Sequence, residues 1–367
     1  MGGAAGCRLK MRILALLTDG FGATGGIARY NRDLMTALSQ SARVTEICVL
    51  PRFAGSSPAI LSKVRQLTPS RARAAWAARA LALARRHRFD AVFCGHLNAA
   101  PLAAMIARFR GAALWVQVHG IEAWQPRAAV YRRSLAAAAL VTSVSRCTRA
   151  RLLAWADVAP HRVRVLPNTL PFVHLPRRKR GELVARHALT DRRIILTVGR
   201  LSARERYKGH DRIIAALPGI VARAADAAYL IVGSGDDRPR LEQMAQDAGV
   251  ADRVVFAGHV ADEELADYFA LADVFAMPST GEGFGIAFLE AAASGLPVIG
   301  GNRDGSVDAL ADGRFGRLVD PLSREEIEGA VVDALQGRQP ARAAEVQRLS
   351  FAHFASHVDA LVHSLGH

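Results

Sequence analysis

Two carboxylates and a glycine-rich stretch stand close together in the second half of the chain. Glu282 and Glu290 are separated by seven residues, Gly-Phe-Gly-Ile-Ala-Phe-Leu, none of which is charged. Glycines ahead of a helix leave backbone N–H groups accessible, and these donors together with the helix dipole favour an anion. An acid on each side would suit a ligand with hydroxyls at both ends and phosphate between them. A glycine-rich turn beside an ordinary surface glutamate is the alternative, and this segment alone does not decide between the two.

Two cations stand earlier in the second half, at positions where parallel-sheet proteins bind phosphate. Arg200 follows the apolar run 194–198, and Lys208 precedes a helical run at 212–217. An arginine can bond phosphate through two parallel N–H groups, and a lysine adds a compact positive charge. The pair is therefore a candidate clamp for a diphosphate.

The first half begins with a similar succession of strand, glycine-rich loop and helix. Gly20, Gly22 and Gly25 match the dinucleotide-binding pattern G-x-G-x-x-G. That pattern also requires an acid at the end of the second strand, where this chain has Arg52. We therefore expect Gly25-Gly26 to bring the backbone close to a phosphate or a sugar rather than to NAD. An NAD(P) dehydrogenase and a purely structural turn remain as alternatives.

Two histidines follow consecutive predicted strands of the first half. His96 comes after the run 91–94, and His119 comes after the run 114–118. The carboxyl ends of parallel strands are where open α/β sheets place ligands. A single histidine is more often structural than catalytic, but two at neighbouring strand ends favour a site.

The elements that must position these residues alternate along the whole chain. Apolar runs alternate with helical patterns in both halves, which predicts the α/β class with two doubly wound parallel sheets. A proline-rich and then basic stretch between the halves predicts a linker. The expected organisation is an extension at 1–10, a first domain at 11–170, a linker at 171–184, a second domain at 185–345 and a final helical segment at 346–367.

Charge is distributed unevenly between the halves. Residues 1–180 contain 29 Lys and Arg against 6 Asp and Glu, whereas residues 181–367 contain 19 against 27. A basic first half suggests contact with a polyanion such as an anionic membrane, a phosphorylated lipid or nucleic acid. The helical run 71–88 has an apolar face around Trp76 and arginines elsewhere, so it could lie on anionic lipid or pack on the sheet. The alternative is that arginine serves solubility only.

Localisation follows from what the chain contains. Its cysteines are scattered, its first ten residues do not resemble a secretory signal, and no run approaches the roughly 18 apolar residues of a membrane span. We expect a cytoplasmic protein, with peripheral contact at the inner face of a bacterial plasma membrane as an extension of the charge argument.

Motifs throughout the second half resemble one family of enzymes. The segment from Glu282 to Glu290, in register with Gly199-Arg200 and Lys208-Gly209, is similar to the retaining glycosyltransferases of family 4. That resemblance implies the GT-B fold, in which two Rossmann-like domains face each other across a cleft. Two segments depart from the family pattern, namely 302–308 after the glycine-rich segment and Pro167-Asn-Thr at the hinge. The first departure bears on the donor sugar.

The resemblance also implies roles for individual residues. Glu290 would bind the ribose, Glu282 the donor sugar, and Arg200 and Lys208 the diphosphate. Backbone groups would bind the sugar, phosphates and base, and the first domain would reach the cleft through its glycine pair and one histidine. These further residues are Gly283, Phe284, Gly285, Ile286, Gly258, Val260, Gly25, Gly26 and His119.

The expected activity is retaining transfer of a hexose from a UDP- or GDP-linked sugar to a saccharide acceptor. The chain has no Asp-x-Asp positioned to hold a metal beside a diphosphate, so we expect metal-independent transfer with no cofactor beyond the nucleotide-sugar co-substrate. A basic first domain suggests a lipid-linked acceptor, as in polysaccharide or lipopolysaccharide biosynthesis. Alternatives are another GT-B enzyme such as a sugar-nucleotide epimerase, a basic nucleic-acid-binding protein, or the dehydrogenase. Few aromatic residues are available to stack on bases, which argues against nucleic acid.

Overall fold

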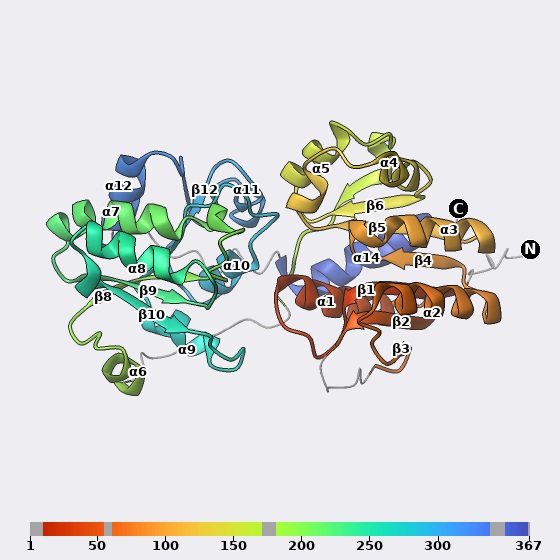
Figure 1. The fold of residues 1–367 in the computed structure, drawn as a ribbon, viewed down its shortest axis with the longest axis horizontal. Coiled ribbons are helices and arrows are strands. Elements are labelled where there is room, and N and C mark those ends of the chain that lie inside the picture. The colour runs from red at the N-terminus through yellow and green to blue at the C-terminus, as the bar shows by residue number, and fades with distance from the viewer. Residues whose placement is uncertain (1–9, 55–60, 171–180, 338–348, 366–367) are drawn as a thin grey trace, which may run out of the picture. The chain divides into compact units, whose positions relative to one another are not determined.

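The chain forms two compact units, shown in the computed structural model of Figure 1. The structure describes residues 10–54, 61–170, 181–337 and 349–365. The first unit contains the described residues up to 170 together with the helix at 351–365, and the second contains the described residues between them.

A parallel sheet of seven strands forms the centre of the first unit, in the order β3-β2-β1-β4-β5-β6-β7. Its central strands are buried and largely apolar, as expected where helices cover both faces of a sheet, whereas the short edge strands β3 and β7 are partly exposed. They are β1 Met11–Asp19, β2 Val44–Phe53, β3 Val64–Gln66, β4 Ala91–Cys94, β5 Ala113–Val118, β6 Leu140–Ser143 and β7 Val163–Val165.

Helices cover both faces of this sheet. Helices α2 to α5 pack on the face formed by alternate strand residues such as Val116 and Val118. Tyr30 of α1 donates a hydrogen bond to Gln117, which lies between those valines and so points to the opposite face. Helix α14 packs against α1 on that second face. The helices are α1 Gly26–Gln40, α2 Arg73–Arg86, α3 Ala100–Arg110, α4 Ala129–Ala136, α5 Arg146–Leu153 and α14 Phe351–Leu365.

The second unit is built around a parallel sheet of six strands, in the order β10-β9-β8-β11-β12-β13. The strands are β8 Arg193–Val198, β9 Ala227–Val232, β10 Val254–Gly258, β11 Val274–Met277, β12 Val298–Gly301 and β13 Arg317–Val319. The helices are α6 Gly181–Arg186, α7 His210–Arg223, α8 Arg238–Asp247, α9 Leu265–Leu271, α10 Ile286–Ala293, α11 Ser306–Ala309 and α12 Arg324–Leu335.

Each sheet reverses its strand order at one point. In the first unit β1 pairs with both β2 and β4, and in the second unit β8 pairs with both β9 and β11. Loops that leave the carboxyl ends of the strands at such a reversal diverge to opposite faces and leave a crevice where open α/β sheets bind ligands. The second unit therefore presents the loops after β8 and β11 as its candidate site.

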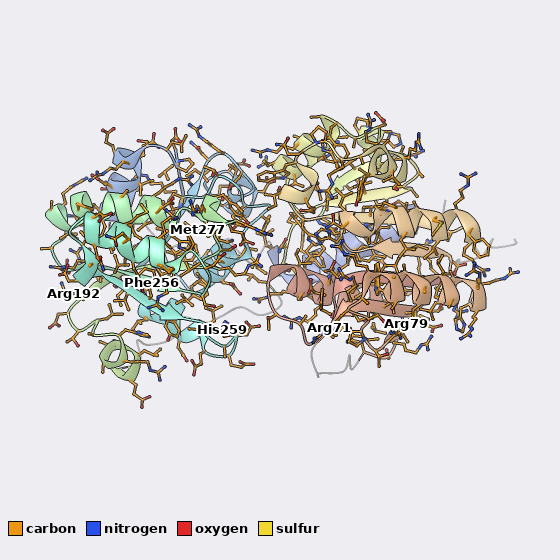
Figure 2. The ribbon with its side chains drawn as sticks, viewed as in Figure 1. Arg71, Arg79, Arg192, Phe256, His259 and Met277 are labelled. Carbon is orange, nitrogen blue, oxygen red and sulfur yellow. The ribbon has the colours of Figure 1, made fainter. Side chains whose placement is uncertain are left out.

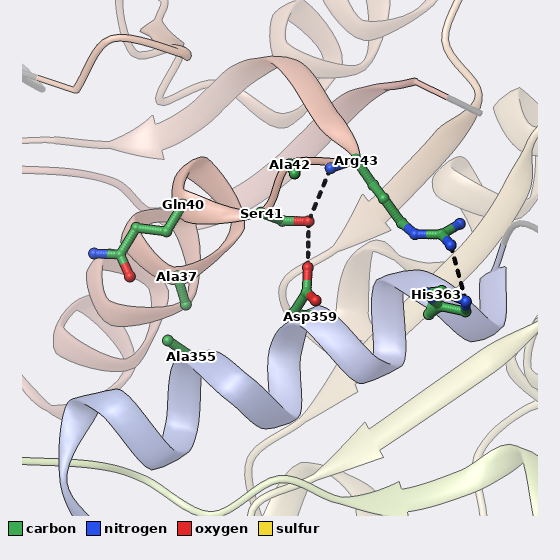
Figure 3. A pocket seen from close by; sticks show the side chains of 8 residues that line it. All are labelled: Ala37, Gln40, Ser41, Ala42, Arg43, Ala355, Asp359 and His363. Atoms are coloured by element: carbon green, nitrogen blue, oxygen red, sulfur yellow. Dashed lines mark hydrogen bonds between the residues drawn. The ribbon is translucent and has the colours of Figure 1, made fainter. Parts of the chain in front are cut away.

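Helix α14 joins the first unit through a polar seam with the end of α1. Ser41 donates a hydrogen bond of 2.6 Å to Oδ1 of Asp359, and Arg43 lies 2.8 Å from Nε2 of His363, as Figure 3 shows. A cavity of about 470 Å³ lies along this seam. The seam adjoins the start of β2, so the cavity lies at the edge of the sheet opposite the carboxyl ends of the strands.

The predicted division into two doubly wound parallel sheets is confirmed. Helix α7 is longer than the predicted run 212–217 and continues through Pro218. Residues 171–180 of the predicted linker lie outside the described residues, and helix α6 begins at Gly181. Within the described ranges, no helix is both long and apolar enough to cross a membrane.

The basic helix at 73–86 packs its apolar face on the sheet, which is one of its two predicted arrangements, and contact of its arginine face with lipid stays a prediction. The Trp76 indole is buried and donates a hydrogen bond of 3.1 Å to the Leu50 carbonyl in β2. Arg79, labelled with Arg71 in Figure 2, donates to the Thr68 carbonyl at 2.7 Å. The apolar face of α2 is therefore used for packing on the sheet.

Candidate functional site

The glycine-rich loop, residues 278–285, leaves the carboxyl end of β11 after Met277, which is labelled in Figure 2. It ends at Gly285, whose φ of 86° lies in the left-handed region. A Cβ at this position would lie 2.6 Å from the Phe288 ring, so the turn into α10 requires glycine. Helix α10 begins at Ile286 with no side-chain cap, so no side chain of the described residues caps the start of the helix, where an anion can bind.

An ion pair joins this loop to the predicted cation. Nζ of Lys208 bonds Oε1 of Glu282, and the two side chains are only 13% and 12% exposed. Lys208 lies in a short helical turn, 206–208, that precedes α7. Gly209 follows with a φ of 83°, and a Cβ there would lie 2.5 Å from the Pro278 carbonyl oxygen. The close approach of Gly209 to Pro278 thus brings Lys208 to Glu282.

Arg200 lies beside this pair but remains open to solvent. Its guanidinium forms an ion pair with Glu205 and is 77% exposed. A Cβ on Gly199 would lie 3.1 Å from Cδ of Lys208, so the backbone next to Arg200 contacts the lysine stem. The structure therefore brings Arg200, Lys208 and Glu282 together at the reversal point of the second sheet.

The remaining predicted residues of the second unit lie on α10 and at the end of β10. Glu290 lies on α10 and is 5% exposed. Gly283 and Phe284 precede Gly285 in the loop, and the Phe284 ring is buried. Gly258 ends β10 and accepts a hydrogen bond of 2.8 Å from the Gly233 N–H.

Beyond β10, the predicted base-contacting backbone is partly open. Figure 2 labels Phe256 within the strand and His259 just after it. His259 is exposed and Val260 is half-buried. This backbone follows the carboxyl end of β10, and Arg200 follows the carboxyl end of β8, two strands away in the same sheet.

Three groups that support the loop were not predicted from the sequence: the Arg212 guanidinium, the Tyr207 carbonyl and the Asp304 carboxylate. Nη1 of Arg212 donates a hydrogen bond of 2.7 Å to the Pro278 carbonyl. The Thr280 N–H donates a hydrogen bond of 2.8 Å to the Tyr207 carbonyl. On the other side, the buried Asp304 carboxylate accepts bonds from Ser279 and from the Glu282 N–H. Asp304 lies in the segment 302–308 that departs from the family pattern, which was the only signal in the sequence.

In the first unit, His119 is held in one orientation at the end of β5. The imidazole Nε2 lies 2.9 Å from the Gly95 carbonyl oxygen. The backbone N–H of His119 donates a hydrogen bond of 2.5 Å to Oε1 of Glu122. Burial lowers the pKa of His119 to about 4, with the Glu122 carboxylate opposing that shift. Because a carbonyl can only accept, neutral His119 carries its proton on Nε2. Its Nδ1 is then an acceptor for a hydroxyl.

The glycine pair of the first unit lies at the start of α1. Gly25 has a φ of 97° and precedes the helix. A Cβ at Gly25 or Gly26 would meet nothing within 4 Å, so the space above this turn is open. Gly20, by contrast, is packed so closely that a Cβ would lie 2.4 Å from the Gln66 amide oxygen. The first glycine of the dinucleotide-like pattern therefore has a packing role.

Metal-binding chemistry has no obvious centre in the described ranges. Across residues 10–54, 61–170, 181–337 and 349–365, no group of three or more His, Cys, Asp or Glu side chains could hold a metal ion. Positive charge near the glycine-rich loop is present at Arg200, Lys208 and the start of α10.

Comparisons with known proteins match both units. A model of glycosyltransferase family 4 matches residues 24–171, and a model of glycosyl transferases group 1 matches residues 192–337. A GDP-mannose-dependent alpha-(1-6)-phosphatidylinositol monomannoside mannosyltransferase of Mycobacterium tuberculosis is 38% identical over 274 residues, covering 70% of this chain and 69% of that protein. The enzyme of the same name from Mycolicibacterium smegmatis is 37% identical, with 70% of each chain covered.

Solved structures show the same architecture. Anabaena HepE, crystallised with UDP and glucose, superposes with a TM-score of 0.78 at 20% identity, covering 96% of this chain and 100% of that one. At that identity the likeness shows the fold alone, which is GT-B. Because the mycobacterial relatives exceed 30% identity and are covered over two thirds of their length, the chain belongs to the family 4, group 1 glycosyltransferases and transfers a glycosyl group from a nucleotide sugar.

Proposed function

We propose that this enzyme transfers a hexose, with mannose from GDP-mannose as the first candidate, to a lipid-linked saccharide acceptor. The Lys208–Glu282 pair beside the uncapped start of α10 is the observation that carries the proposal. It offers a cation for phosphate and a carboxylate for sugar hydroxyls within one small region. The mycobacterial relatives, named as GDP-mannose-dependent mannosyltransferases, support mannose in particular.

The proposed chemistry is metal-independent and retains the anomeric configuration. The bond between the anomeric carbon and the diphosphate oxygen breaks, and the acceptor oxygen bonds that carbon on the same face. The acceptor proton passes to the leaving phosphate oxygen. Arg200, Lys208 and the α10 N–H groups would stabilise the negative charge that builds on the diphosphate. The pairing of Glu282 with Lys208 favours a role for that carboxylate in binding rather than as a nucleophile.

Calorimetry tests the donor proposal. We expect GDP and GDP-mannose to bind more tightly than UDP, ADP and their sugars. Lys208→Ala should weaken GDP by roughly tenfold through the lost charge-assisted bond. Asp252→Ala, at an exposed carboxylate before β10, is the matched control and should leave GDP binding unchanged. Equal binding of all nucleotides, or none, would contradict the donor assignment.

Assays of turnover test the metal and the stereochemistry. Activity should persist in EDTA, and the product of a mannosyl transfer should be the α-anomer by NMR. Loss of activity in EDTA with recovery in Mn²⁺ would overturn metal independence.

Helices α3 and α4 provide the surface that favours a lipid-linked acceptor. They pack together, and neither contains an acidic residue. Phe109 and Met105 of α3 are 63% and 51% exposed, and Val130 of α4 is 48% exposed. Exposed arginines flank them, among them Arg108 and Arg132. Apolar side chains framed by cations suit peripheral contact with an anionic membrane.

Vesicle sedimentation tests this surface. The enzyme should bind phosphatidylglycerol vesicles at low salt and lose most binding at high salt. The double change Met105→Ser with Phe109→Ser should weaken binding by roughly tenfold or more, since buried apolar area is lost. Leu322→Ser removes an equally exposed apolar side chain, 66% exposed, from the second unit and serves as the control. Equal effects of both changes would contradict the proposed surface.

A further inference from the structure

The Asp304 carboxylate is buried next to the glycine-rich loop and accepts hydrogen bonds from it. It is 1% exposed and follows β12, the strand next to β11. Oδ2 accepts from the Ser279 hydroxyl at 2.8 Å and from the Glu282 N–H at 2.7 Å. Oδ1 accepts from the Ser306 N–H at 2.9 Å and from the Ser306 hydroxyl at 2.6 Å. One buried carboxylate thus joins the loop to the start of α11.

Both polar groups of the Glu282 backbone are held by this neighbouring segment. The Glu282 N–H bonds Asp304, and the Glu282 carbonyl accepts from the Gly305 N–H at 2.9 Å. A Cβ on Gly305 would lie 2.0 Å from the Gly283 carbonyl oxygen, so the two segments touch through their backbones. Glu282 therefore has little freedom to move while Asp304 is in place.

The start of the loop has different supports. Arg212 holds the Pro278 carbonyl, and Tyr207 holds the Thr280 N–H. These contacts do not involve Asp304. Asp304 reaches the loop start only through the Ser279 hydroxyl, whereas at Glu282 it holds the backbone N–H itself. Loss of the Asp304 carboxylate should consequently loosen the loop most around Glu282, while Arg212 and Tyr207 still hold the backbone of its start.

Burial of this carboxylate costs desolvation free energy, and its hydrogen bonds must offset that cost in the folded protein. Desolvation raises the pKa of Asp304, although the bonds from Ser306, Glu282 and Ser279 oppose the shift. Because Oδ2 accepts the hydrogen bond of the Glu282 N–H, this buried carboxylate acts on the loop through that residue.

We propose that Asp304 is a positioning residue that fixes Glu282 beside Lys208, so that the enzyme distinguishes a nucleotide sugar from the free nucleoside diphosphate. The inference rests on the proposed function, in which Glu282 binds the donor sugar. Because Lys208 and α10 would hold the diphosphate, the contribution of Asp304 falls on the sugar part of the donor.

Calorimetry with GDP-mannose and GDP tests this role in the full-length chain. Asp304→Ala removes the acceptor of the Glu282 N–H, and we expect GDP-mannose affinity and 1/KM to fall roughly tenfold. GDP affinity should change by less than about twofold, because the first-turn N–H groups of α10 are untouched. The thermal midpoint should fall in either case because four hydrogen bonds are lost, but a purely structural role would weaken both ligands together.

Ser306→Ala is the matched control. It removes the hydroxyl bond to Asp304 and the 2.9 Å contact with the Ser279 hydroxyl, but it leaves the bond between Asp304 and the Glu282 N–H. It should therefore lower stability without changing the ratio of GDP-mannose to GDP affinity. If the alanine variant at position 304 does not fold, Asp304→Asn replaces one acceptor oxygen with a donor and should shift the same ratio in the same direction.

The outcomes separate the two proposals. Wild-type enzyme that binds neither GDP-mannose nor UDP-glucose would overturn the proposed function and this inference with it. Wild-type binding of GDP-mannose with an unchanged ratio in the position-304 variants would overturn this inference alone. A lowered ratio in those variants but not in Ser306→Ala supports it.

Discussion

At the scale of single residues, the central feature is that each predicted cation has an acidic partner. Lys208 pairs with Glu282 in a nearly buried setting, whereas Arg200 pairs with Glu205 at the surface. A buried pair is costly to break on one side only, because the remaining charge has neither water nor a partner. The exposed pair contributes little to stability.

This difference predicts how substitutions at the buried pair behave. Lys208→Met or Glu282→Gln alone should lower the free energy of unfolding by about 2–4 kcal/mol, and the double variant should recover most of that loss. Turnover should remain low in all three. Urea unfolding monitored in the second unit measures the cycle. Additive losses in the double variant would show that the two side chains do not interact.

Arg200→Ala serves as the contrast. Its stability cost should stay below about 1 kcal/mol because the guanidinium is exposed. Its turnover should nevertheless fall if the guanidinium contacts the leaving diphosphate.

The sequence predicted these residues individually but not their pairing. Strand ends and glycine patterns are local signals, so Arg200, Lys208 and Glu282 were identified from the chain. The contact between Lys208 and Glu282 spans 74 positions and depends on the approach of Gly209 to Pro278. The role of Asp304 depends on a similar long-range contact, which no local pattern encodes.

At the scale of elements, glycines control how closely the loops of the second unit approach one another. Gly209 has a left-handed φ and its hydrogen faces the Pro278 carbonyl. Its position between the Lys208 turn and α7 links the geometry of a helix start to that of the loop after β11.

Alanine substitutions at Gly209 and at Gly111 distinguish the cost of steric contact from the cost of backbone strain. Gly111→Ala, at a φ of 63° with nothing within 4 Å, should cost about 1 kcal/mol from backbone strain alone. Gly209→Ala should cost at least about twice that, because a Cβ must also displace Pro278. Chemical denaturation measures both. Equal costs would mean that the close approach to Pro278 carries no energy.

Helices α2 and α3 show why surface roles are harder to predict than cores. Both combine alanine, arginine and large apolar residues, and the sequence left the run 71–88, which contains α2, open between lipid contact and packing on the sheet. In the structure Trp76 of α2 packs on the sheet, whereas Phe109 of α3 points outward. The difference arises from the rotation of each helix against its neighbours, which composition does not determine.

At the scale of the whole molecule, buried titratable groups couple stability to pH. Asp33 of α1 is 8% exposed, and burial raises its pKa to about 6 despite the nearby Arg29 and Arg32. The folded protein therefore binds this proton more tightly than the unfolded chain does. Ionisation of Asp33 therefore lowers the free energy of unfolding of the first unit as the pH rises from about 4 to about 6.

Asp33→Asn should remove that penalty. The variant should be more stable than wild type above pH 6 by roughly 2–3 kcal/mol, and the difference should vanish near pH 4. Urea unfolding of the first unit at several pH values measures the difference. A difference that does not depend on pH would show that Asp33 does not titrate in this range.

The packing of α14 on α1 has a consequence for the order in which the chain assembles during translation. The first unit consists of two segments of sequence, and the entire second unit is synthesised between them. When residues 10–170 have left the ribosome, the face of α1 that carries Tyr30 still lacks its partner Phe354, whose ring centroid lies 6.0 Å away in the finished protein. The second unit is continuous and can complete its core as it emerges. The first unit is thus the first to be synthesised but the last to complete its fold. Its apolar α1 face stays exposed, and accessible to chaperones, until α14 has been synthesised.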